Sequence, residues 1–525
     1  MKKYLYQIFL LSFFFLNQIR AQLIYLPLDH WAYDFLERME TRQVLTDLRS
    51  GSRPFTREQI AGFAAEIDRY VKDHPNALSR TEAAIFERLK GEFWHELQGK
   101  DLSIQKRERE PHFYGRDLKT GSVYFDILSG GSSRFRSGDA DPEEKRVHSA
   151  FYGGILRGNL WGLSFYSDNR IFTEWGSRKY TQHYNASAGY PIGINSDSSR
   201  GTWDTSVSYL GCAWKRLQFQ FGRDRVKWGP AYWGGLLLSG LAPDFDLFKI
   251  SANIGASVFT WLHGELRSDF SHKWISAHRL EVTVLRGIDI GLHELVIYGN
   301  RGIEVAYLNP VIPYLIAEHT LGDRDNVSLG FDFAVHRIRN FKFYGEFFVD
   351  DLFEPWEVFS DYWGNKLAFT LGGYWVDPLD LKNTGLRFEY TRIEPYVYTH
   401  EDSVNVYEHY NSGLGHFLQP NSDGLFFLAE YQPFLSFRTA CEFRSIRHGE
   451  GNRRTPHREE DGTKKSFLKG VVEHQTSAGL LFEWEIIRDL WWRTELSRVW
   501  ADHYQNVQDD NRAWNEWSFS LYVNW

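Results

Sequence analysis

The last nine residues constrain the fold of this chain more than any other stretch, because they form an amphipathic β-strand with a period of two. Apolar side chains fall on one face of that strand: Trp517, Phe519, Leu521, Val523 and Trp525. Mostly polar side chains fall on the other face: Ser518, Ser520, Tyr522 and Asn524. In an outer-membrane barrel the terminal strand pairs with the first strand and removes the free edge of the sheet. The pattern predicts such a closing strand, and the last strand of a soluble β-domain is the alternative.

The composition favours a membrane barrel over a soluble domain. Aromatic residues make up 17% of the 525 residues, with 20 Trp, 28 Tyr and 40 Phe, yet the mean hydropathy is -0.44. A lipid-facing band with aromatic girdles, alternating with a wet lumen, gives this combination. The formal net charge of -8 indicates no nucleic-acid partner. The two cysteines, Cys212 and Cys441, are too few for a disulfide framework, and we expect them to be unpaired.

Residues 1–21 have the pattern of a secretory signal peptide. Lys2 and Lys3 form a charged start, an apolar core follows, and Ala21 is the expected cleavage position. The apolar core is too short to span a bilayer. We therefore expect export to a Gram-negative-type cell outer membrane, and a buried amino-terminal helix is the alternative.

Residues 22–100 show a helical pattern and predict a small periplasmic or plug segment. We expect Asp29 to cap the first helix, Thr56 to cap the second, and Ser79 or Thr81 to begin the third. Apolar side chains recur on one face of each helix.

Two runs in this segment carry a resemblance. They are Pro27-Leu28-Asp29-His30-Trp31-Ala32-Tyr33 and Thr56-Arg57-Glu58-Gln59-Ile60-Ala61. Together they resemble one degenerate S-layer-homology unit. That family binds cell-wall polymers, which implies peptidoglycan as a partner of residues 22–100. A helical bundle that packs against the barrel or plugs it is the alternative.

Residues 101–120 are charged and loop-like, and we interpret them as a linker to a barrel formed by residues 121–525. Strands with a period of two recur through that region, between long polar segments at 129–148 and 169–202 and tight turns such as Gly158-Asn159. Long external loops and short periplasmic turns are typical of outer-membrane barrels. We expect an all-β transmembrane fold, an antiparallel outer-membrane β-barrel of about 18 strands with a small α-helical segment at its start.

Individual strands predict which side chains face the lumen. Residues 252–262 have the pattern of one strand. Within 341–350 the apolar and polar positions alternate, apart from Phe348, so that Glu346 faces the lumen, and Glu389 does so in a later strand.

Three segments are rich in Gly, Pro, Trp and charged residues where a barrel strand does not need them. Their motifs are G-R-D-x-x-x-x-G-P at 222–230 with L-L-L-S at 236–239, Y-L-N-P at 307–310, and L-G-H-x-L-x-P-N-S-D at 414–423. In this order they resemble the capsule assembly Wzi family of outer-membrane proteins. The resemblance implies a barrel with a helical amino-terminal part, a lectin-like role in binding capsular or other exported polysaccharide, and no catalysis.

These segments supply the candidate polysaccharide-binding residues. Sugar rings stack on aromatic faces, and charged groups bind hydroxyls or carboxylates. The candidates are Arg223, Asp224, Arg225, Lys227, Trp228, Asn309, His416, Asn421 and Asp423. In the alternative, Arg223 and Asp224 form an internal ion pair that holds an inserted loop inside the barrel, and Gly229-Pro230 makes its turn.

Enzymatic and metal-binding motifs are absent from the sequence. It contains no G-x-S-x-G and no H-E-x-x-H run. His400, His409 and His416 lack a ligand spacing, and Asp323-Arg324-Asp325-Asn326 lacks the rest of a calcium loop. We therefore expect no catalytic residues, no metal site and no cofactor.

We interpret the chain as a monomeric outer-membrane barrel that binds capsular or exported polysaccharide and contacts outer-membrane lipid. A porin or substrate-specific channel is the first alternative, and an outer-membrane enzyme is the second. A fold of this kind supports several functions, so the function depends on the resemblance.

Overall fold

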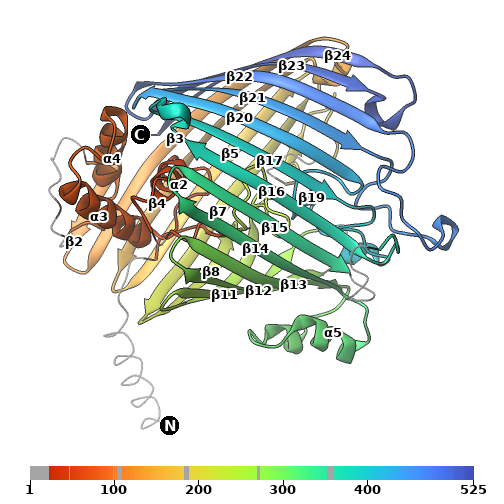
Figure 1. Cartoon of the computed structure of the whole chain (residues 1–525), viewed down its shortest axis with the longest axis horizontal. Coiled ribbons are helices and arrows are strands. Elements are labelled where there is room, and N and C mark those ends of the chain that lie inside the picture. The colour runs from red at the N-terminus through yellow and green to blue at the C-terminus, as the bar shows by residue number, and fades with distance from the viewer. Residues whose placement is uncertain are drawn as a thin grey trace.

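A computed structural model describes residues 23–46, 48–98, 100, 102, 109–182, 189–268, 272–351 and 360–524. Within these ranges the chain forms a closed antiparallel β-barrel of 18 strands, with helices at its two ends (Figure 1). The predicted fold class is therefore confirmed. The predicted signal peptide, most of the charged part of the linker and Trp525 lie outside the described residues.

The barrel strands follow one another around the wall in chain order. The first nine are β3 (Gly121–Gly138), β4 (Arg146–Leu160), β5 (Leu163–Gly176), β7 (Arg200–Trp214), β8 (Leu217–Asp224), β10 (Phe245–Ile254), β11 (Ser257–Leu266), β12 (Lys273–Leu285) and β13 (Ile288–Gly299). The other nine are β14 (Asn326–Ile338), β15 (Phe341–Asp351), β16 (Lys366–Val376), β17 (Thr384–Ile393), β20 (Ser422–Phe434), β21 (Phe437–His448), β22 (Glu473–Ile487), β23 (Leu490–Asp502) and β24 (Arg512–Asn524). Short strands β2 (Tyr114–Leu118) and β6 (Gly193–Ile194) pair beside them.

The terminal strand closes the barrel as predicted. β24 pairs antiparallel with β3, with Trp517 opposite Phe135 and Phe519 opposite Ser133. The side chains of Trp517, Phe519 and Leu521 are 37%, 42% and 49% exposed, on the outer face of the wall. Each apolar residue therefore faces lipid while its neighbours face the lumen.

The same alternation runs through β15. Phe343 and Phe347 point outward, while Tyr344 and Glu346 are buried inside the barrel. Phe348, which breaks the polar pattern, points inward and is buried against Tyr398 and Tyr407 of an internal loop. The predicted lumenal orientation of Glu346 is confirmed, and Glu389 is likewise fully buried.

Two predicted loop boundaries were wrong. Residues 129–148 were expected to form a long loop, but β3 continues to Gly138 and β4 begins at Arg146. The glycine-rich start of this stretch stays in the sheet because aromatic rings pack over it: a Cβ at Gly130 would lie 2.5 Å from Cε1 of Phe151. The second long segment is also shorter than expected, because β5 continues to Gly176 and β7 begins at Arg200.

Two turns also differ from expectation. Residues 252–262 form parts of two strands, β10 and β11, because Gly255 adopts a φ of 61° and reverses the chain. The turn expected at Gly158-Asn159 lies instead at Trp161-Gly162, whose φ angles of 53° and 83° suit a two-residue hairpin.

The helical segment contains α2 (Ala32–Thr41), α3 (Arg57–Asp73) and α4 (Arg80–Glu92). Thr56 and Ser79 each form a capping box with the residue three positions on, which confirms those two helix starts. Asp29 was expected to cap α2, but the N-cap is Trp31 and has no side-chain cap. The turn that begins at Pro27 brings His30 to the helix start instead, where its Nδ1 accepts from the amide of Ala32. None of the described helices is long and apolar enough to cross a membrane.

These three helices pack against one end of the barrel, where short turns connect the strands (Figure 1). We call it the short-turn end and the opposite end the long-loop end. Ion pairs join the helices to the wall: Arg38 pairs with Asp377, and Arg88 pairs with Glu485 and Asp489. The helical segment therefore packs against the short-turn end of the barrel.

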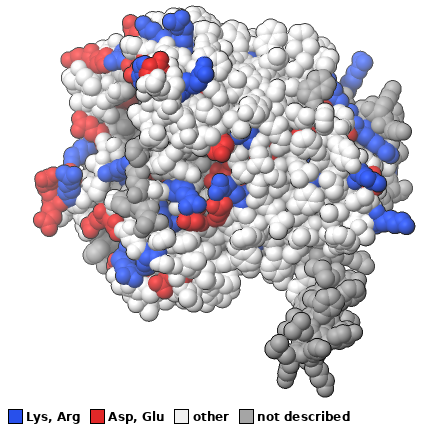
Figure 2. All heavy atoms as spheres, turned by 180° about the vertical axis from the view of Figure 1, so that it is seen from behind, with Lys and Arg blue, Asp and Glu red and all other residues white. Residues whose placement is uncertain are grey.

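The opposite face of the barrel shows the expected distribution of charge. Figure 2 shows a broad area of the wall with few Lys, Arg, Asp or Glu side chains, one mixed charged patch near the middle of the view, and further charged side chains towards the ends. At the long-loop end the connection between β13 and β14 contains α5 (Tyr314–Leu321). Cys212 and Cys441 are free thiols, as expected.

Candidate functional site

The connection between β8 and β10, residues 225–244, folds into the lumen, and we call it the inward loop. Its strand β9 (Lys227–Trp228) pairs with β1 (Ser52–Arg53), which precedes α3. The amide of Gly229 donates to the carbonyl of Gly51 over 2.8 Å. Gly229 has a φ of 104°, and a Cβ there would lie 2.0 Å from Oε1 of Glu346, so the turn requires glycine. The helical segment therefore holds the inward loop from the short-turn end of the barrel.

Two lumenal carboxylates hold the inward loop from the side. Glu346 on β15 accepts from the amides of Ala231 (2.9 Å) and Leu236 (2.7 Å). Glu389 on β17 accepts from the amides of Tyr232 and Trp233. Buried amides need acceptors, and charged acceptors form the stronger hydrogen bonds, so these glutamates fix the loop's backbone.

A second connection, residues 394–421 between β17 and β20, covers the inward loop. The hydroxyl groups of Tyr398 and Tyr407 donate to the carbonyls of Leu236 and Leu237, each over 2.7 Å. The amide of Ser239 donates to the carbonyl of Leu414 over 2.9 Å. The motifs at 222–239 and 414–423, far apart in the sequence, therefore meet inside the barrel.

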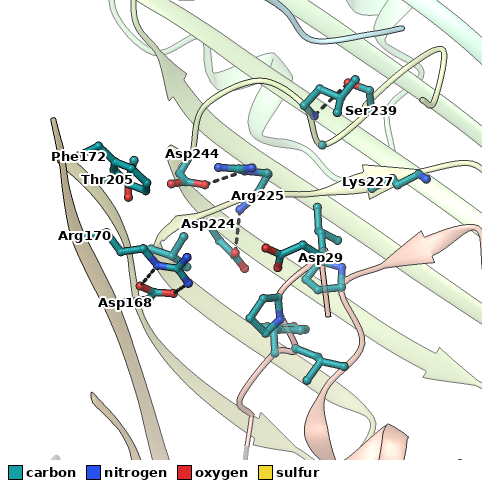
Figure 3. A pocket seen from close by; sticks show the side chains of 18 of the residues that line it. Asp29, Asp168, Arg170, Phe172, Thr205, Asp224, Arg225, Lys227, Ser239 and Asp244 are labelled. Carbon is teal, nitrogen blue, oxygen red and sulfur yellow. Dashed lines mark hydrogen bonds and ion pairs between the residues drawn. The ribbon is translucent and has the colours of Figure 1, made fainter. Parts of the chain in front are cut away.

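A cavity of about 660 Å³ remains between the inward loop and the wall formed by β5 and β7 (Figure 3). Its floor is the segment 25–29, which hydrogen-bonds to the wall where the amide of Tyr25 donates to Tyr209 Oη over 2.7 Å. Because β5 runs from the short-turn end to the long-loop end, Tyr166 lies deepest and Glu174 lies nearest the long loops. The cavity therefore extends from the amino-terminal segment 25–29 towards the long-loop end.

Ion pairs line both sides of the cavity. On β5, the guanidinium of Arg170 donates to both carboxylate oxygens of Asp168, over 2.8 and 2.7 Å. On the inward loop, Arg225 Nε donates to Asp244 Oδ1 over 2.8 Å (Figure 3). Lys227 Nζ donates to the carbonyl of Ala231, and burial lowers the pKa of Lys227 to about 8. The charged side chains are thus held in place before any ligand enters.

Aromatic rings from both sides also face the cavity. Phe172 on β5 and Tyr232 and Trp233 on the inward loop are half-buried and line it. Trp233 is fixed by a stack on Phe426 and by a 2.7 Å hydrogen bond from its Nε1 to Glu442. Such rings, with one face accessible, provide the stacking surfaces that sugar rings use.

The structure places three of the predicted candidates at this cavity: Asp224, Arg225 and Lys227. Trp228 lies directly beneath, 2% exposed, in the apolar cluster that holds the inward loop. His416 is buried against the loop, where a Cβ on Gly234 would lie 3.3 Å from its ring.

The other candidates lie elsewhere. Arg223 is on the outer face of the wall and pairs with Asp246 over 2.8 Å. The expected Arg223–Asp224 ion pair does not form, because adjacent strand residues point to opposite faces. Asn421 and Asp423 are buried at the start of β20, where they hydrogen-bond residues of β21 and of the loop that follows it.

Asn309 is exposed in the connection between β13 and β14, and its Oδ1 accepts from the amide of Val311. It lies outside the set of residues that line the cavity.

Sequence reasoning missed most of the wall side of the cavity. Residues 169–202 were expected to be a loop, so Arg170, Phe172 and Glu174 were not considered as strand residues. The signal was present: Ile171 and Trp175, which face outward, alternate with them. Tyr232 and Trp233 lie between the motifs at 222–230 and 236–239, and no spacing in the sequence marked them as binding residues.

Comparison with known proteins agrees with this architecture. The model of the family "Capsule assembly protein Wzi" matches residues 162–513. Among solved structures, the chain is similar to the Wzi outer-membrane protein of Escherichia coli, which is involved in group 1 capsule assembly and is a carbohydrate-binding β-barrel. The two are 13% identical over 96% of this chain and 99% of that one, with a TM-score of 0.59.

Other structures are less similar. The outer-membrane protein OprD from Pseudomonas aeruginosa is 8% identical over 77% of this chain and 93% of its own, with a TM-score of 0.45. OccAB1 from Acinetobacter baumannii is 10% identical over 77% and 96%, also with a TM-score of 0.45. No curated protein matches the sequence. Since the family model spans more than half of the sequence, the chain belongs to the Wzi family of capsule assembly proteins.

Proposed function

We propose that this outer-membrane barrel binds a capsular or other exported polysaccharide and helps to assemble or retain it at the cell surface, without cleaving it. Membership of the capsule assembly family is the observation that carries the proposal. The carbohydrate-binding relative from E. coli supports it.

The lumenal cavity is the proposed sugar-binding site. Phe172, Tyr232 and Trp233 offer ring faces, and Asp168, Arg170 and Arg225 offer fixed hydrogen-bonding groups. A volume of about 660 Å³ accommodates a short oligosaccharide, within the usual range for small-ligand pockets. The cavity therefore binds a chain end or a side branch of the polysaccharide.

The charge balance of the cavity selects the kind of sugar. Five carboxylates line it, Asp29, Asp168, Glu174, Asp224 and Asp244, against three cations, Arg170, Arg225 and Lys227. Like charges repel strongly in a poorly hydrated site. Neutral sugars or amino sugars therefore bind in preference to uronic acids.

The proposal also assigns roles to the rest of the chain. The barrel acts as a monomer, because its closed sheet leaves no free edge for another copy. The helical segment acts first as a plug at the short-turn end. Binding of peptidoglycan by residues 22–100 is a separate prediction, tested by co-sedimentation of the full-length protein with isolated peptidoglycan.

Replacing Trp233 by Ala tests the binding site. Loss of one stacking face should weaken binding about tenfold, a change of about 1.4 kcal/mol. The measurement is binding of the purified protein to an array of neutral, amino and uronic glycans. Trp161→Ala is the matched control, because Trp161 lies 70% exposed in a turn at the short-turn end.

A second variant separates binding from folding. Phe172→Ala changes the opposite wall of the cavity and should weaken the same glycans. Heat-modified mobility on a gel shows whether each barrel is folded. Unchanged binding in both folded variants would exclude the cavity, and absence of glycan binding by the unmodified protein would remove the proposed function itself.

A further inference from the structure

A cluster of three buried side chains lies where the helical segment meets the wall, away from the sugar cavity. Glu40 comes from the last turn of α2, Asp289 from β13 and His336 from β14. Each offers one ligand atom, and these atoms all lie within 4.8 Å of one another. The residues are 0%, 4% and 3% exposed. The cluster spans the boundary between two separately folded parts of the chain.

The sheet places Asp289 and His336 side by side. Asp289 is opposite Ala334 in the β13–β14 pair, so His336 is its diagonal neighbour on the same inward face. The backbone amide of His336 donates to the carbonyl of Gly287 over 3.0 Å. Both side chains are therefore fixed by the wall, and α2 brings Glu40 to them from the short-turn end.

Three polar atoms of this cluster have no hydrogen-bond partner among the described residues. Neither ring nitrogen of His336 has a hydrogen-bond partner in the described ranges, nor has Oε1 of Glu40. Asp289 Oδ1 accepts from Thr283 Oγ1 over 2.6 Å, and no cation of the described ranges forms an ion pair with Asp289. Buried polar atoms without partners are costly and call for a water or an ion.

The neighbouring cations pair with one oxygen of Glu40 and with Glu37. Lys342 Nζ contacts Glu40 Oε2 over 2.8 Å and Glu37 Oε1 over 3.1 Å, and Arg387 contacts Glu37 Oε2 over 3.1 Å. Lys342 therefore supplies a cation to Glu40 Oε2, whereas Glu40 Oε1 and the Asp289 carboxylate form no ion pair with a Lys or Arg of the described ranges. A divalent cation would supply positive charge to both.

We propose that Glu40, Asp289 and His336 bind a divalent transition-metal ion, best matched by Zn²⁺, which fastens the helical segment to the barrel wall. One imidazole and two carboxylates form a mixed nitrogen and oxygen donor set, which suits Zn²⁺ better than the all-oxygen sites of Ca²⁺ or Mg²⁺. This is a metal site that the sequence did not predict, since its three residues lie far apart in the chain.

The distances suit an ion between the donors. His336 Nδ1 and Glu40 Oε1 are 4.0 Å apart, too far for a hydrogen bond. Two ligands at about 2.1 Å from a tetrahedral zinc ion lie about 3.4 Å apart, so small side-chain rotations complete the site. A protonated imidazole would instead need an acceptor close to each of its nitrogen atoms.

The test measures metal content directly. The full-length protein is purified with a tag free of histidine, equilibrated with Zn²⁺, dialysed and analysed by mass spectrometry for zinc. We expect about one zinc per chain in the unmodified protein and none in Asp289→Asn or His336→Gln. Matched controls are Asp323→Asn and His319→Gln, which change exposed residues at the long-loop end.

A second readout covers variants that fold poorly. A chelator should lower the melting temperature of the unmodified barrel, and added Zn²⁺ should restore it, whereas Asp289→Asn should show neither response. Equal zinc content in all five proteins, or no zinc in any, would overturn the proposal. A melting temperature that changes with pH but not with chelator would assign the cluster to a protonated His336 instead.

Discussion

Single residues fix the geometry of the lumenal cavity through contacts that lie outside the cavity. Glu346 and Glu389 each accept two amides of the inward loop, and Tyr398 and Tyr407 donate to its carbonyls. A buried backbone group that loses its partner costs about 1–3 kcal/mol. These hydrogen bonds therefore hold the inward loop in one conformation, and the cavity beside it exists before a ligand binds.

His416 makes this arrangement sensitive to acid. Its Nδ1 accepts from the amide of Leu418 over 3.1 Å, which requires the neutral ring, and burial, with Lys227 nearby, lowers its pKa to about 3. The unfolded chain takes up a proton near pH 6.5, and the folded chain does not. The contribution of neutral His416 to the free energy of unfolding is fully present above about pH 6.5 and is lost as the pH falls towards 3. At pH 5 the free energy of unfolding should already be lower by about 2 kcal/mol.

Urea unfolding of the barrel in detergent between pH 7.5 and 5 measures this effect. His416→Asn keeps an acceptor for the Leu418 amide but has no titrating ring, so the slope should fall by the share of His416. Other buried histidines such as His409, whose pKa burial also lowers to about 3, should keep their share of the slope. His319→Asn changes an exposed histidine and should keep the full slope. Equal slopes in all three proteins would show that another group titrates.

At the scale of elements, buried ion pairs join the helical segment to the wall. Arg88 on α4 pairs with Glu485 over 2.5 Å and with Asp489 over 2.9 Å, at the turn between β22 and β23. These side chains are mostly buried, so removing one partner leaves uncompensated charge and costs about 3 kcal/mol.

Arg88→Gln should therefore loosen α4 without unfolding the barrel. We expect faster hydrogen exchange in α3 and α4 and earlier proteolytic cleavage there, while the strands remain protected. Arg69→Gln is the matched control, because Arg69 is exposed on α3 and contacts only the carbonyl of Ala65 in the described part of the chain. Exchange that rises equally in both variants would assign no special role to the Arg88 ion pairs.

Helices and strands were predictable from the sequence where a single local pattern determines the structure. Alternation placed Glu346 and Glu389 in the lumen, and capping boxes placed the starts of α3 and α4. Prediction failed where packing overrides local chemistry, as at Gly130, where an aromatic ring covers glycine within a strand. The candidate site was only partly predictable: motif residues such as Arg225 stood out in the sequence, but the part of β5 that faces them, from residue 169 onward, was expected to be a loop.

At the scale of the whole molecule, the function depends on contacts that no local pattern contains. The amide of Tyr25 bonds to Tyr209, and Lys342 contacts Glu37 and Glu40 across more than 300 residues of sequence. These contacts fasten the helical segment and the residues before it to the inside of the wall. A barrel of 18 strands is wide enough for an aqueous channel, so its filling distinguishes a binding protein from a pore.

The filled lumen predicts low ion conductance in planar bilayers. The helical segment covers the short-turn end, and the inward loop crosses the lumen between Glu346, Glu389 and Glu442. Replacing residues 229–240 by a short Gly-Ser linker should enlarge the cavity but raise the conductance little, since α2 to α4 still close the short-turn end. Combining that replacement with Arg88→Gln should produce frequent openings, because the plug is then loosened as well. Stable, porin-sized conductance of the unmodified protein would instead support transport through the barrel and would contradict a lumen built to hold a sugar.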